Sequence, residues 1–371
     1  MSNTNTVRFN NSNKQFHNEL RRRVDLYFAE RKLSKAGDYT MYIKTIVLFA
    51  AYLVPYFLIV FQVFDNKVDW LLLSAIMGFA MAGIGMSIMH DANHGSYSKS
   101  VTFNKLLGYF SISLLSGSSI NWKIQHNIIH HTYTNVHEHD EDIAPPGILR
   151  FEPHAPRKKI HKFQFLYAWF FYSIMTIMWS TVKDFKQLTR YHRKGFLKGR
   201  KLWLVRGANT SFPVELSIII VAKILYFSYM LVPYFLVKEM TFLNWLTGYA
   251  VLHAIAGLIM AMVFQLAHVV GENEFPLPTE DGNLENHWAE HQLKTTMNFA
   301  LGNRLLGWYV GGLNHQVEHH LFPSICHVHY PKIARIVEKT AREFDLPYRT
   351  KKTFVGALWA HQVMLWNLGR K

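Results

Sequence analysis

Three short segments of the sequence hold most of the side chains that could do chemistry. Each places histidines or a glutamine three or four residues apart, a spacing at which the side chains of a helix share one face. The segments are "HDANH" with His90 and His94, "HNIIHH" with His126, His130 and His131, and "QVEHH" with Gln316, His319 and His320. Imidazole acts as a pH switch, a proton shuttle or a metal ligand. One such pair alone would indicate a surface pair, but three clusters of repeated spacing predict a metal centre.

The number of candidate ligands favours two metal ions. Imidazole suits zinc, copper, iron and nickel, and a single zinc ion takes three or four ligands. A further histidine, His268, stands just past the end of the last long apolar segment. With it, eight histidines and one glutamine are enough for two ions with four or five ligands each. The carboxylates inside the segments, Asp91 and Glu318, are few, so we expect them to orient the imidazoles. Cys326 is the only cysteine, which excludes an intrachain disulfide and a cysteine-based metal site.

Four apolar segments are long enough to carry these side chains to a membrane surface. A bilayer core about 30 Å thick takes roughly 20 apolar residues in a helix. Half of the 371 residues are hydrophobic and the mean hydropathy is +0.01, which indicates several spans plus a large aqueous part. The spans are expected at residues 41–63, 68–89, 213–237 and 242–264. The short links "FDNK" and "KEMT" make each pair of spans a helical hairpin.

The distribution of basic residues distinguishes between the membrane topologies that the lengths of the apolar segments allow. Residues 106–120 are too short to cross, whereas residues 163–182 are long enough. Residues 182–206 carry nine Lys/Arg and one acid, and the first 40 residues carry eight Lys/Arg. Basic residues favour the cytoplasmic side. Four crossings, with residues 163–182 in the interface or packed on other helices, place both basic regions and all the histidine clusters at the cytoplasmic face.

These observations predict an all-α integral membrane protein. Its four transmembrane helices form two hairpins, and a cytosolic helical cap holds the histidine-rich site. The net charge of +15 follows from the same cytoplasmic bias. We exclude nucleic-acid binding, because no nucleic-acid motif is present and the charge is interleaved with apolar spans. The polar start "MSNTNTVRFNN" lacks the apolar core of a secretory signal.

A histidine-rich site for two metals beside a hydrocarbon layer favours iron and oxygen chemistry on a lipid chain, because unactivated C–H bonds need a strong oxidant. The three segments, their order and the spans between them resemble membrane fatty acid desaturases over about residues 41–340. The phrase "GGLNHQVEHHLFP" resembles the front-end subgroup, which inserts a double bond between an existing one and the carboxyl end. The resemblance implies an O2-dependent fatty acyl desaturase with a non-haem di-iron centre that faces the cytosol.

The resemblance also implies the iron ligands. The family's ligand positions are matched by His90, His94, His126, His130, His131, His319 and His320, with His268 as the additional histidine after the fourth span. Gln316 stands where stearoyl-type enzymes carry a histidine, and it either binds metal or only forms hydrogen bonds. Those enzymes also carry an asparagine four residues before the additional histidine. Phe264 occupies that position here, so the role of that asparagine does not carry over.

An acyl-CoA or acyl-lipid substrate and an external electron donor follow from the resemblance. The string "HPGG" of a fused cytochrome b5 domain is absent, and the 40 residues before the first span are too few for that domain. We expect electrons from a ferredoxin or a free cytochrome b5, which the basic face could dock. Residues 1–40 and 341–371 are expected to be cytosolic segments that flank the desaturase domain. The expected membrane is the bacterial inner membrane, and otherwise the endoplasmic reticulum.

Several residues outside the segments have two interpretations. Minor candidates for ligands are His287, His291 and His315. His253 lies too deep in the fourth span to reach the site, so we expect it to hydrogen-bond a neighbouring helix. Asp140, Glu141 and Asp142 either contact the imidazoles as polar partners or form a solvated acidic loop. Trp122 either lines an acyl tunnel or packs as an ordinary aromatic residue.

Two rival functions remain open from the sequence. A hydroxylase on the same scaffold would add an oxygen instead of removing two hydrogens. A non-catalytic membrane protein that binds or transports metal would leave lipids unchanged, but ligands at the depth of the bilayer centre are absent. The acyl chain length, the head group, the position of the new bond, the electron donor and the oligomeric state are not determined by the sequence.

Overall fold

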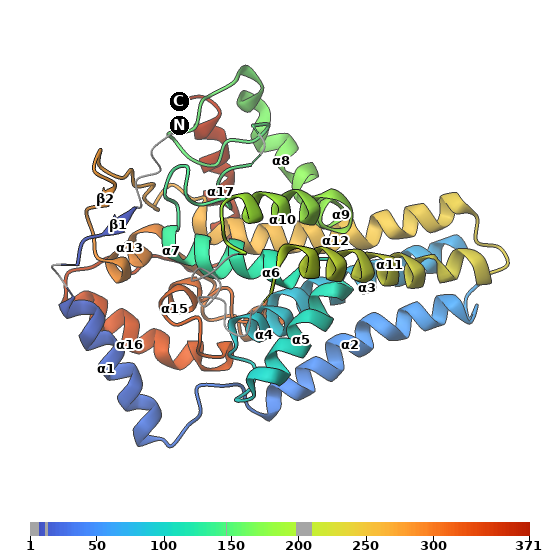
Figure 1. Ribbon diagram of the computed structural model, residues 1–371, viewed down its shortest axis with the longest axis horizontal. Helices are drawn as coiled ribbons and strands as arrows, with labels where there is room; N and C mark the ends of the chain where they lie inside the picture. Colours follow the sequence, from blue (N-terminus) through green and yellow to red (C-terminus); the bar gives the residue numbers. More distant parts are fainter. Residues whose placement is uncertain (1–6, 12–13, 146, 198–209) are drawn as a thin grey trace.

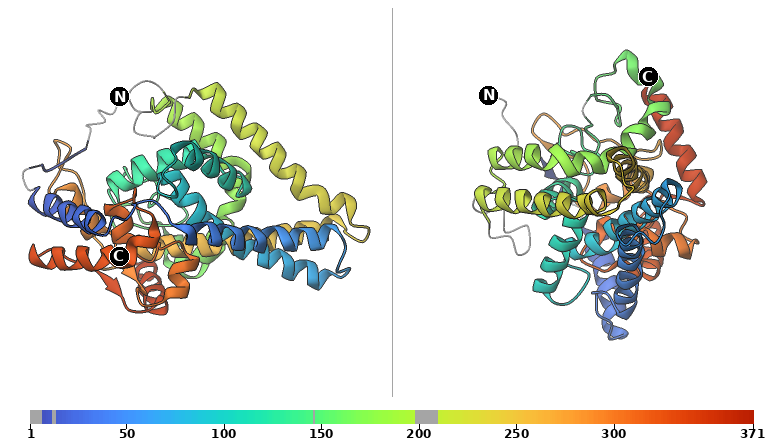
Figure 2. Two further views of the ribbon diagram at one scale, coloured as in Figure 1. Left: turned by 90° about the horizontal axis from the view of Figure 1, so that it is seen from below. Right: turned by 90° about the vertical axis from the view of Figure 1, so that its right-hand side faces the viewer.

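The computed structural model describes residues 7–11, 14–145, 147–197 and 210–371, and in this part the chain is mainly helical (Figure 1). Four long helices project together from one end of the molecule (Figures 1 and 2). They are α2 (Tyr39–Val60), α3 (Lys67–Gly83), α11 (Phe212–Leu236) and α12 (Phe242–His268). The remaining helices gather at the opposite end, which we call the histidine end because it holds the three histidine segments.

The four long helices confirm the predicted candidate spans. Helix α3 continues through the π-helical turn η1 (Ile84–Met89) into α4 (His90–His94), so this span has 28 residues, and α12 has 27. At 1.5 Å per residue each of these two helices is about 40 Å long, which exceeds a hydrocarbon core of about 30 Å. Both therefore extend beyond the predicted spans, and they carry histidines at their ends.

The outer faces of the long helices suit a lipid environment. The apolar window of the α3 span is 72% buried, whereas that of α11 is only 28% buried. The exposed side chains on the outer helices are largely apolar, and Ile46 on α2 and Leu225 on α11 are examples. A partly exposed helix that is apolar all round needs surroundings other than water. Helix α3 therefore forms the centre of this bundle, and α2 and α11 form its outer face.

Residues 163–182 belong to a bent helical pair that by length and composition could count as a fifth span. One arm is η3 (Lys159–Phe163) with α8 (Gln164–Ser173), and the other is α9 (Met175–Met178), the π-helical η4 (Trp179–Lys183) and α10 (Asp184–Arg193). The two arms meet at an angle of 52°. The bend contacts the middle of α12, where Thr176 Oγ1 donates to the backbone oxygen of His253 at 2.9 Å.

Both ends of the bent pair return to the histidine end of the molecule. At the start of α8, Gln164 Nε2 donates to the backbone oxygen of Leu365 in the C-terminal helix. On α10, the hydroxyl of Tyr191 donates to Glu141, which follows the second histidine segment. The pair therefore enters the bundle and leaves it at the same end.

The histidine end is built from shorter elements. From the first half of the chain come α1 (Gln15–Glu30), α5 (Val101–Leu114), α6 (Ser119–Trp122), the π-helical η2 (Lys123–His130) and α7 (His131–Tyr133). From the second half come α13 (Trp288–Thr295), α14 (Arg304–Tyr309), α15 (Gln316–Leu321), η6 (His327–His329), α16 (Tyr330–Glu343) and α17 (Phe354–Leu368). Two short parallel strand pairs join β1 (Arg8–Phe9) to β2 (Asn283–Leu284) and β3 (Asn298–Phe299) to β4 (Thr350–Lys351).

The segments near both termini pack onto this end. Helix α1 buries one apolar residue per turn and lies in one hydrophobic cluster with α16. The buried residues of α1 are Phe16, Leu20, Val24 and Phe28. Helix α17 buries Met364 and Leu365 in a cluster that includes Ala261 of α12. Residues 1–40 and 341–371 therefore contain helices that help to position the central elements.

Candidate metal centre

The first histidine segment forms the end of the second long helix. His90 and His94 lie on α4 with ring centroids 4.6 Å apart, so they share one face as their spacing predicts. Helix α4 ends at Gly95, whose φ is +75°. This left-handed conformation favours glycine and closes the helix directly after the second imidazole.

The second histidine segment departs from the register of an α-helix. It forms the π-helical η2, in which residues five apart become neighbours because the hydrogen bonds run from i to i+5. Nε2 of His126 therefore lies 3.3 Å from Nε2 of His131. The ring of His130 still stacks on that of His126, with centroids 5.3 Å apart as the spacing predicts, and its Nδ1 faces Asp140. The π-helix thus lets one short segment serve two different groups of imidazoles.

Two glycines bring the third histidine segment against the first. Gly311 and Gly312 have φ values of +63° and +69°, which other residues rarely adopt. A Cβ atom on Gly311 would lie 2.6 Å from Cα of Ser87 in η1, and one on Gly312 would lie 2.8 Å from Cβ of His327. Only glycine allows backbones to approach this closely, so the "GG" before "LNHQVEHH" lets α15 dock beside the first segment.

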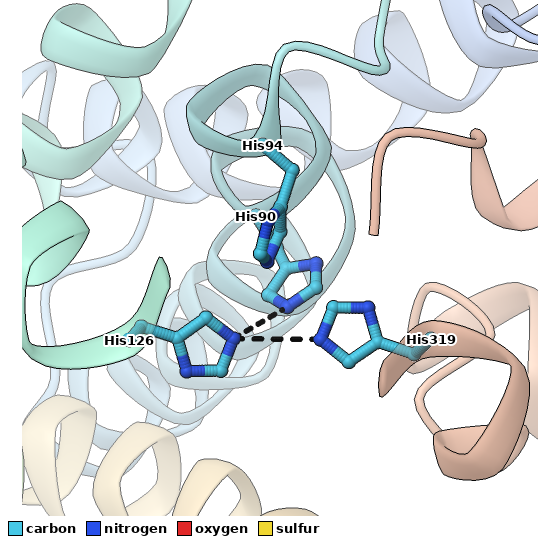
Figure 3. Close-up of side chains that lie close together, drawn as sticks. All are labelled: His90, His94, His126 and His319. Carbon is cyan, nitrogen blue, oxygen red and sulfur yellow. Dashed lines mark hydrogen bonds between the residues drawn. The ribbon is translucent and has the colours of Figure 1, made fainter. Parts of the chain in front are cut away.

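Four imidazoles converge at one point, and we call them the four-histidine group (Figure 3). One nitrogen of each ring lies within 4.8 Å of the corresponding nitrogen of the other three. The members are His90 and His94 from α4, His126 from η2 and His319 from α15. Nε2 of His126 is 3.3 Å from Nε2 of His90 and 3.4 Å from Nε2 of His319.

A second set of imidazoles lies next to the first, and we call it the three-histidine group. Its nitrogens also lie within 4.8 Å of one another, and its members are His130 from η2, His268 from α12 and His320 from α15. The ring of His131 is 4.5 Å from the rings of both His319 and His320, between the two groups. Gln316 is 2% exposed and lies beside His268. All eight predicted histidines and the predicted glutamine are therefore brought together.

The imidazole nitrogens fit a metal centre. Buried nitrogens without a hydrogen-bond partner are rare in proteins, and here they include Nε2 of His94, His130 and His320. Burial lowers the pKa values of His126, His131, His319 and His320. The neutral ring keeps the lone pair that a metal ion needs. A set of donors this rich in nitrogen suits iron, zinc or copper better than magnesium or calcium.

An acidic side chain holds the outer nitrogen of one imidazole. Nδ1 of His130 lies 3.0 Å from Oδ2 of Asp140, whose carboxylate also accepts two backbone N–H groups. Burial would lower the pKa of His130, but the Asp140 carboxylate raises it above its usual value. Nδ1–H is thereby tied to Asp140, and Nε2 is left to face the three-histidine group. Asp140 is therefore a partner of an imidazole, whereas its neighbour Glu141 binds Tyr191.

Two further imidazoles have polar partners that the sequence did not reveal. Nδ1 of His319 is 3.2 Å from the hydroxyl of Tyr330, and Nδ1 of His320 is 2.9 Å from Oε1 of Gln292. Both partners come from other elements, α16 and α13, and they lie 11 and 28 residues away along the chain. The one available signal was the position of Gln292 directly after His291, in a segment already rich in histidine.

A buried chain of charged and polar groups reaches the first segment from α2. Nζ of Lys44 is 2.7 Å from Nε2 of His327, whose Nδ1 is 2.7 Å from Oδ2 of Asp91. An ammonium group can only donate, so the proton of the His327 ring sits on Nδ1 and is donated to Asp91. Oδ1 of Asp91 is 3.8 Å from Nδ1 of His90. Asp91 therefore bonds to His327 rather than to His90, and the chain from Lys44 to Asp91 contains two residues that the sequence did not single out.

The minor ligand candidates His287, His291 and His315 lie outside both groups. Each contacts a backbone or side-chain group instead. His253 contacts Tyr226 of α11 and Thr176 of α9, which confirms the predicted bond between helices. The ring of Trp122 lies 4.5 Å from that of His126 and covers one side of the four-histidine group.

Comparison with known proteins identifies the class. The sequence profile described as "Fatty acid desaturase" matches residues 68–352, so the chain belongs to the fatty acid desaturase family. An sn-1 linoleoyl-lipid 6-desaturase of Arthrospira platensis is 34% identical over 93% of this chain and 90% of its own length. The protein of the same name from Synechocystis sp. is 34% identical over 96% of both chains. An acyl-lipid (8-3)-desaturase of Physcomitrium patens is 36% identical over 96% of this chain and 72% of its own length.

These similarities place the chain in the front-end subgroup of the family, as the third histidine segment predicts. The protein is an integral membrane oxidoreductase that desaturates fatty acyl chains.

Proposed function

We propose that the two histidine groups hold two iron ions, with which the protein uses O2 to introduce a cis double bond into the acyl chain of a membrane lipid. The observation that carries this proposal is the convergence of seven imidazoles in two groups, with His131 next to His126, in a chain of the fatty acid desaturase family. The proposed ligands are His90, His94, His126, His130, His131, His268, His319 and His320. Gln316 is a further candidate, as a weak neutral ligand or as a hydrogen-bond partner beside His268.

Bound iron would supply the reduction of O2 and an oxidant strong enough for unactivated C–H bonds. Overall, one O2, two electrons, two protons and two hydrogens from adjacent carbons would give one double bond and two waters. The residues of the chain itself hold the imidazoles and exclude water, since seven of the eight histidines are buried. Trp122 closes one side of the four-histidine group and would limit how the acyl chain approaches it.

The proposed substrate is a lipid-linked acyl chain that already contains a double bond, and the new bond forms on its carboxyl side. The names of the similar proteins support this, since they specify a linoleoyl-lipid and an acyl-lipid. An acyl-CoA with the same chain is the alternative substrate.

The proposed topology has four crossings in two hairpins, and the bent pair dips into the bilayer and returns. Support comes from the contacts of both ends of the bent pair at the histidine end. The basic stretch at residues 182–206 supports a cytoplasmic position for the cap and its site. Of that stretch, residues 198–206 lie outside the described part of the chain. The proposed membrane is the bacterial inner membrane, with the endoplasmic reticulum as the alternative.

Electrons would come from a separate carrier of the ferredoxin or cytochrome b5 type. The net charge of +15 supports docking of an acidic carrier on the cytoplasmic face. Such docking weakens with salt, because exposed charges are screened. The rate of product formation should therefore fall as ionic strength rises when the carrier is limiting.

The proposal is tested by lipid analysis of a host that makes no polyunsaturated chains and is fed linoleate. Wild type, His320→Ala and His154→Ala are expressed together with a ferredoxin or cytochrome b5. His154 is exposed and bonds a backbone oxygen away from the site, so its variant is the control. Gas chromatography with mass spectrometry should find a new double bond on the carboxyl side in the wild type and the control, and none in His320→Ala.

Other products would contradict particular parts of the proposal. A new bond on the methyl side would retain the chemistry and overturn the proposed position. A product heavier by one oxygen would favour the hydroxylase. Metal analysis of the purified protein that finds fewer than two iron ions per fully loaded chain would overturn the two-iron assignment.

A further inference from the structure

Helix α13 lies across the end of the second histidine segment. Three of its side chains share one face and point at the same short stretch of backbone. Nε1 of Trp288 donates to the backbone oxygen of His131 at 3.0 Å, and Nε2 of Gln292 donates to the same oxygen at 3.3 Å. Nε2 of His291 is 2.8 Å from the backbone oxygen of Thr134 and acts as the donor to it. These spacings of three and four residues are those of one helix face.

The accepting oxygens stand where a helix ends. Helix α7 stops at Tyr133, and the last carbonyl groups of a helix have no donor within the helix itself. Helix α13 supplies the missing donors from a distant part of the chain. A buried carbonyl group without a donor is destabilising, so this contact stabilises the end of the segment that carries His130 and His131.

The same contact determines the proton position on one imidazole. Because Nε2 of Gln292 donates to a carbonyl, its Oε1 is the acceptor atom of the amide. Oε1 is 2.9 Å from Nδ1 of His320 and 2.9 Å from Oγ1 of Thr134. An amide oxygen can only accept, so Nδ1 of His320 carries the proton. Its buried Nε2, which has no protein partner, then has its lone pair free for the three-histidine group.

We propose that Gln292 is a positioning residue that sets the tautomer and the orientation of His320, and that α13 holds the second and third histidine segments in register through it. One side chain contacts the backbone of the second segment and the ring of the third. The proposal rests on the proposed function, because it concerns the readiness of His320 to bind metal. In this proposal α13 supports the metal-binding histidines although none of its own residues is a metal ligand.

Metal binding by the full-length protein in detergent tests this role separately from catalysis. Metal is removed with a chelator, and Co(II) is then titrated while absorption is recorded and bound metal is counted. Gln292→Met keeps the size of the side chain but removes all three of its hydrogen bonds. Gln292→Glu keeps an acceptor for His320 and loses the donor to the backbone oxygen of His131. Glu290→Gln, at a half-buried position on the same helix, is the matched control.

We expect Gln292→Met to weaken binding of one of the two ions by about 10- to 100-fold and to leave the other unchanged, as is typical when a partner of a ligating histidine is lost. Gln292→Glu should restore binding to within a few-fold of wild type, and the control should match wild type. The Co(II) absorption band of only one ion should shift in Gln292→Met.

Three results would overturn the proposal. In the first, Gln292→Met binds both ions with wild-type affinity. In the second, Gln292→Met binds both ions equally weakly. In the third, Gln292→Glu lowers the affinity as much as Gln292→Met does. Trp288→Phe provides a second test if the methionine variant is poorly folded. It removes a donor to His131 without touching His320, so it should lower the unfolding temperature and retain both affinities. A wild-type chain that binds no second ion would instead contradict the proposed two-metal function.

Discussion

The four-histidine group and the three-histidine group differ in how their imidazoles are held. In the three-histidine group, Nδ1 of His130 faces the Asp140 carboxylate at 3.0 Å and Nδ1 of His320 faces the Gln292 amide at 2.9 Å. In the four-histidine group the corresponding partners are weaker. They are a phenol, Tyr330 at 3.2 Å from His319, and a more distant carboxylate, Asp91 at 3.8 Å from His90.

This difference indicates that His130 and His320 are held more strongly than His90 and His319. An acceptor on Nδ1 fixes the tautomer and raises the basicity of the ligating nitrogen. Three protein ligands are enough for a catalytic metal site, whereas two are not a typical set. We therefore expect the three-histidine group to depend more on each of its members and on each of their partners.

The largest difference should appear when one histidine is removed from each group. His268→Ala leaves two imidazoles in its group and should lose one ion, so that one iron per chain remains at saturating metal. His94→Ala leaves three imidazoles, so it should still bind two ions, one of them more weakly. Product formation should fall at least about 100-fold in both, since loss of a partner of a ligand alone costs 10- to 100-fold. Metal counting with lipid analysis checks this, and identical stoichiometry in the two variants would contradict the comparison.

The next effect concerns the acidic partner. Asp140→Asn removes the charge that holds Nδ1 of His130, and it should weaken binding of one ion by about 10- to 100-fold. Co(II) titration of the chelated protein measures the change. Glu138→Gln in the same loop is the control, because the Glu138 side chain is 80% exposed. Wild-type affinity in Asp140→Asn would show that the carboxylate does not support the group.

A smaller effect is expected where the first and third segments meet. Gly311→Ala requires alanine at a φ of +63° and places Cβ against Ser87, so it should destabilise the fold by about 1–2 kcal/mol or more. Thermal unfolding in detergent measures this. Gly302→Ala is the matched control, since a Cβ atom there meets nothing within 4 Å. Equal unfolding temperatures for the two variants would mean that the close approach does not constrain α15.

The smallest effect should come from the phenol. Tyr330→Phe removes one neutral hydrogen bond from His319, which contributes about 1 kcal/mol. Binding of one ion should therefore weaken by only about fivefold, clearly less than in Asp140→Asn. The same Co(II) titration compares the two variants. If Tyr330→Phe weakened metal binding as much as Asp140→Asn or more, the phenol would not be the weaker partner, and the comparison between the two groups would be wrong.

Much of the fold and the membership of the site could be predicted because they depend on local patterns. Apolar length located the four candidate spans, and the spacing of the histidines located the three segments. The division into two groups was not predictable in the same way. The spacing paired His126 with His130, whose rings do stack, but in the π-helical η2 Nε2 of His126 also lies 3.3 Å from Nε2 of His131. Whether a helix adopts a π turn depends on its packing, which a spacing rule does not include.

The sequence by itself determined the chemistry that this protein has available: seven histidines in three segments of helical spacing, His268 after the fourth span, one cysteine, and apolar segments long enough to reach a membrane. Only the tertiary structure decided which imidazoles meet and which side chains hold them. Gln292, Tyr330 and His327 lie on elements that contact the histidines through folding alone. The physical reason is that a hydrogen bond to Nδ1 requires a particular atom within about 3 Å, and distance along the chain carries no information about that.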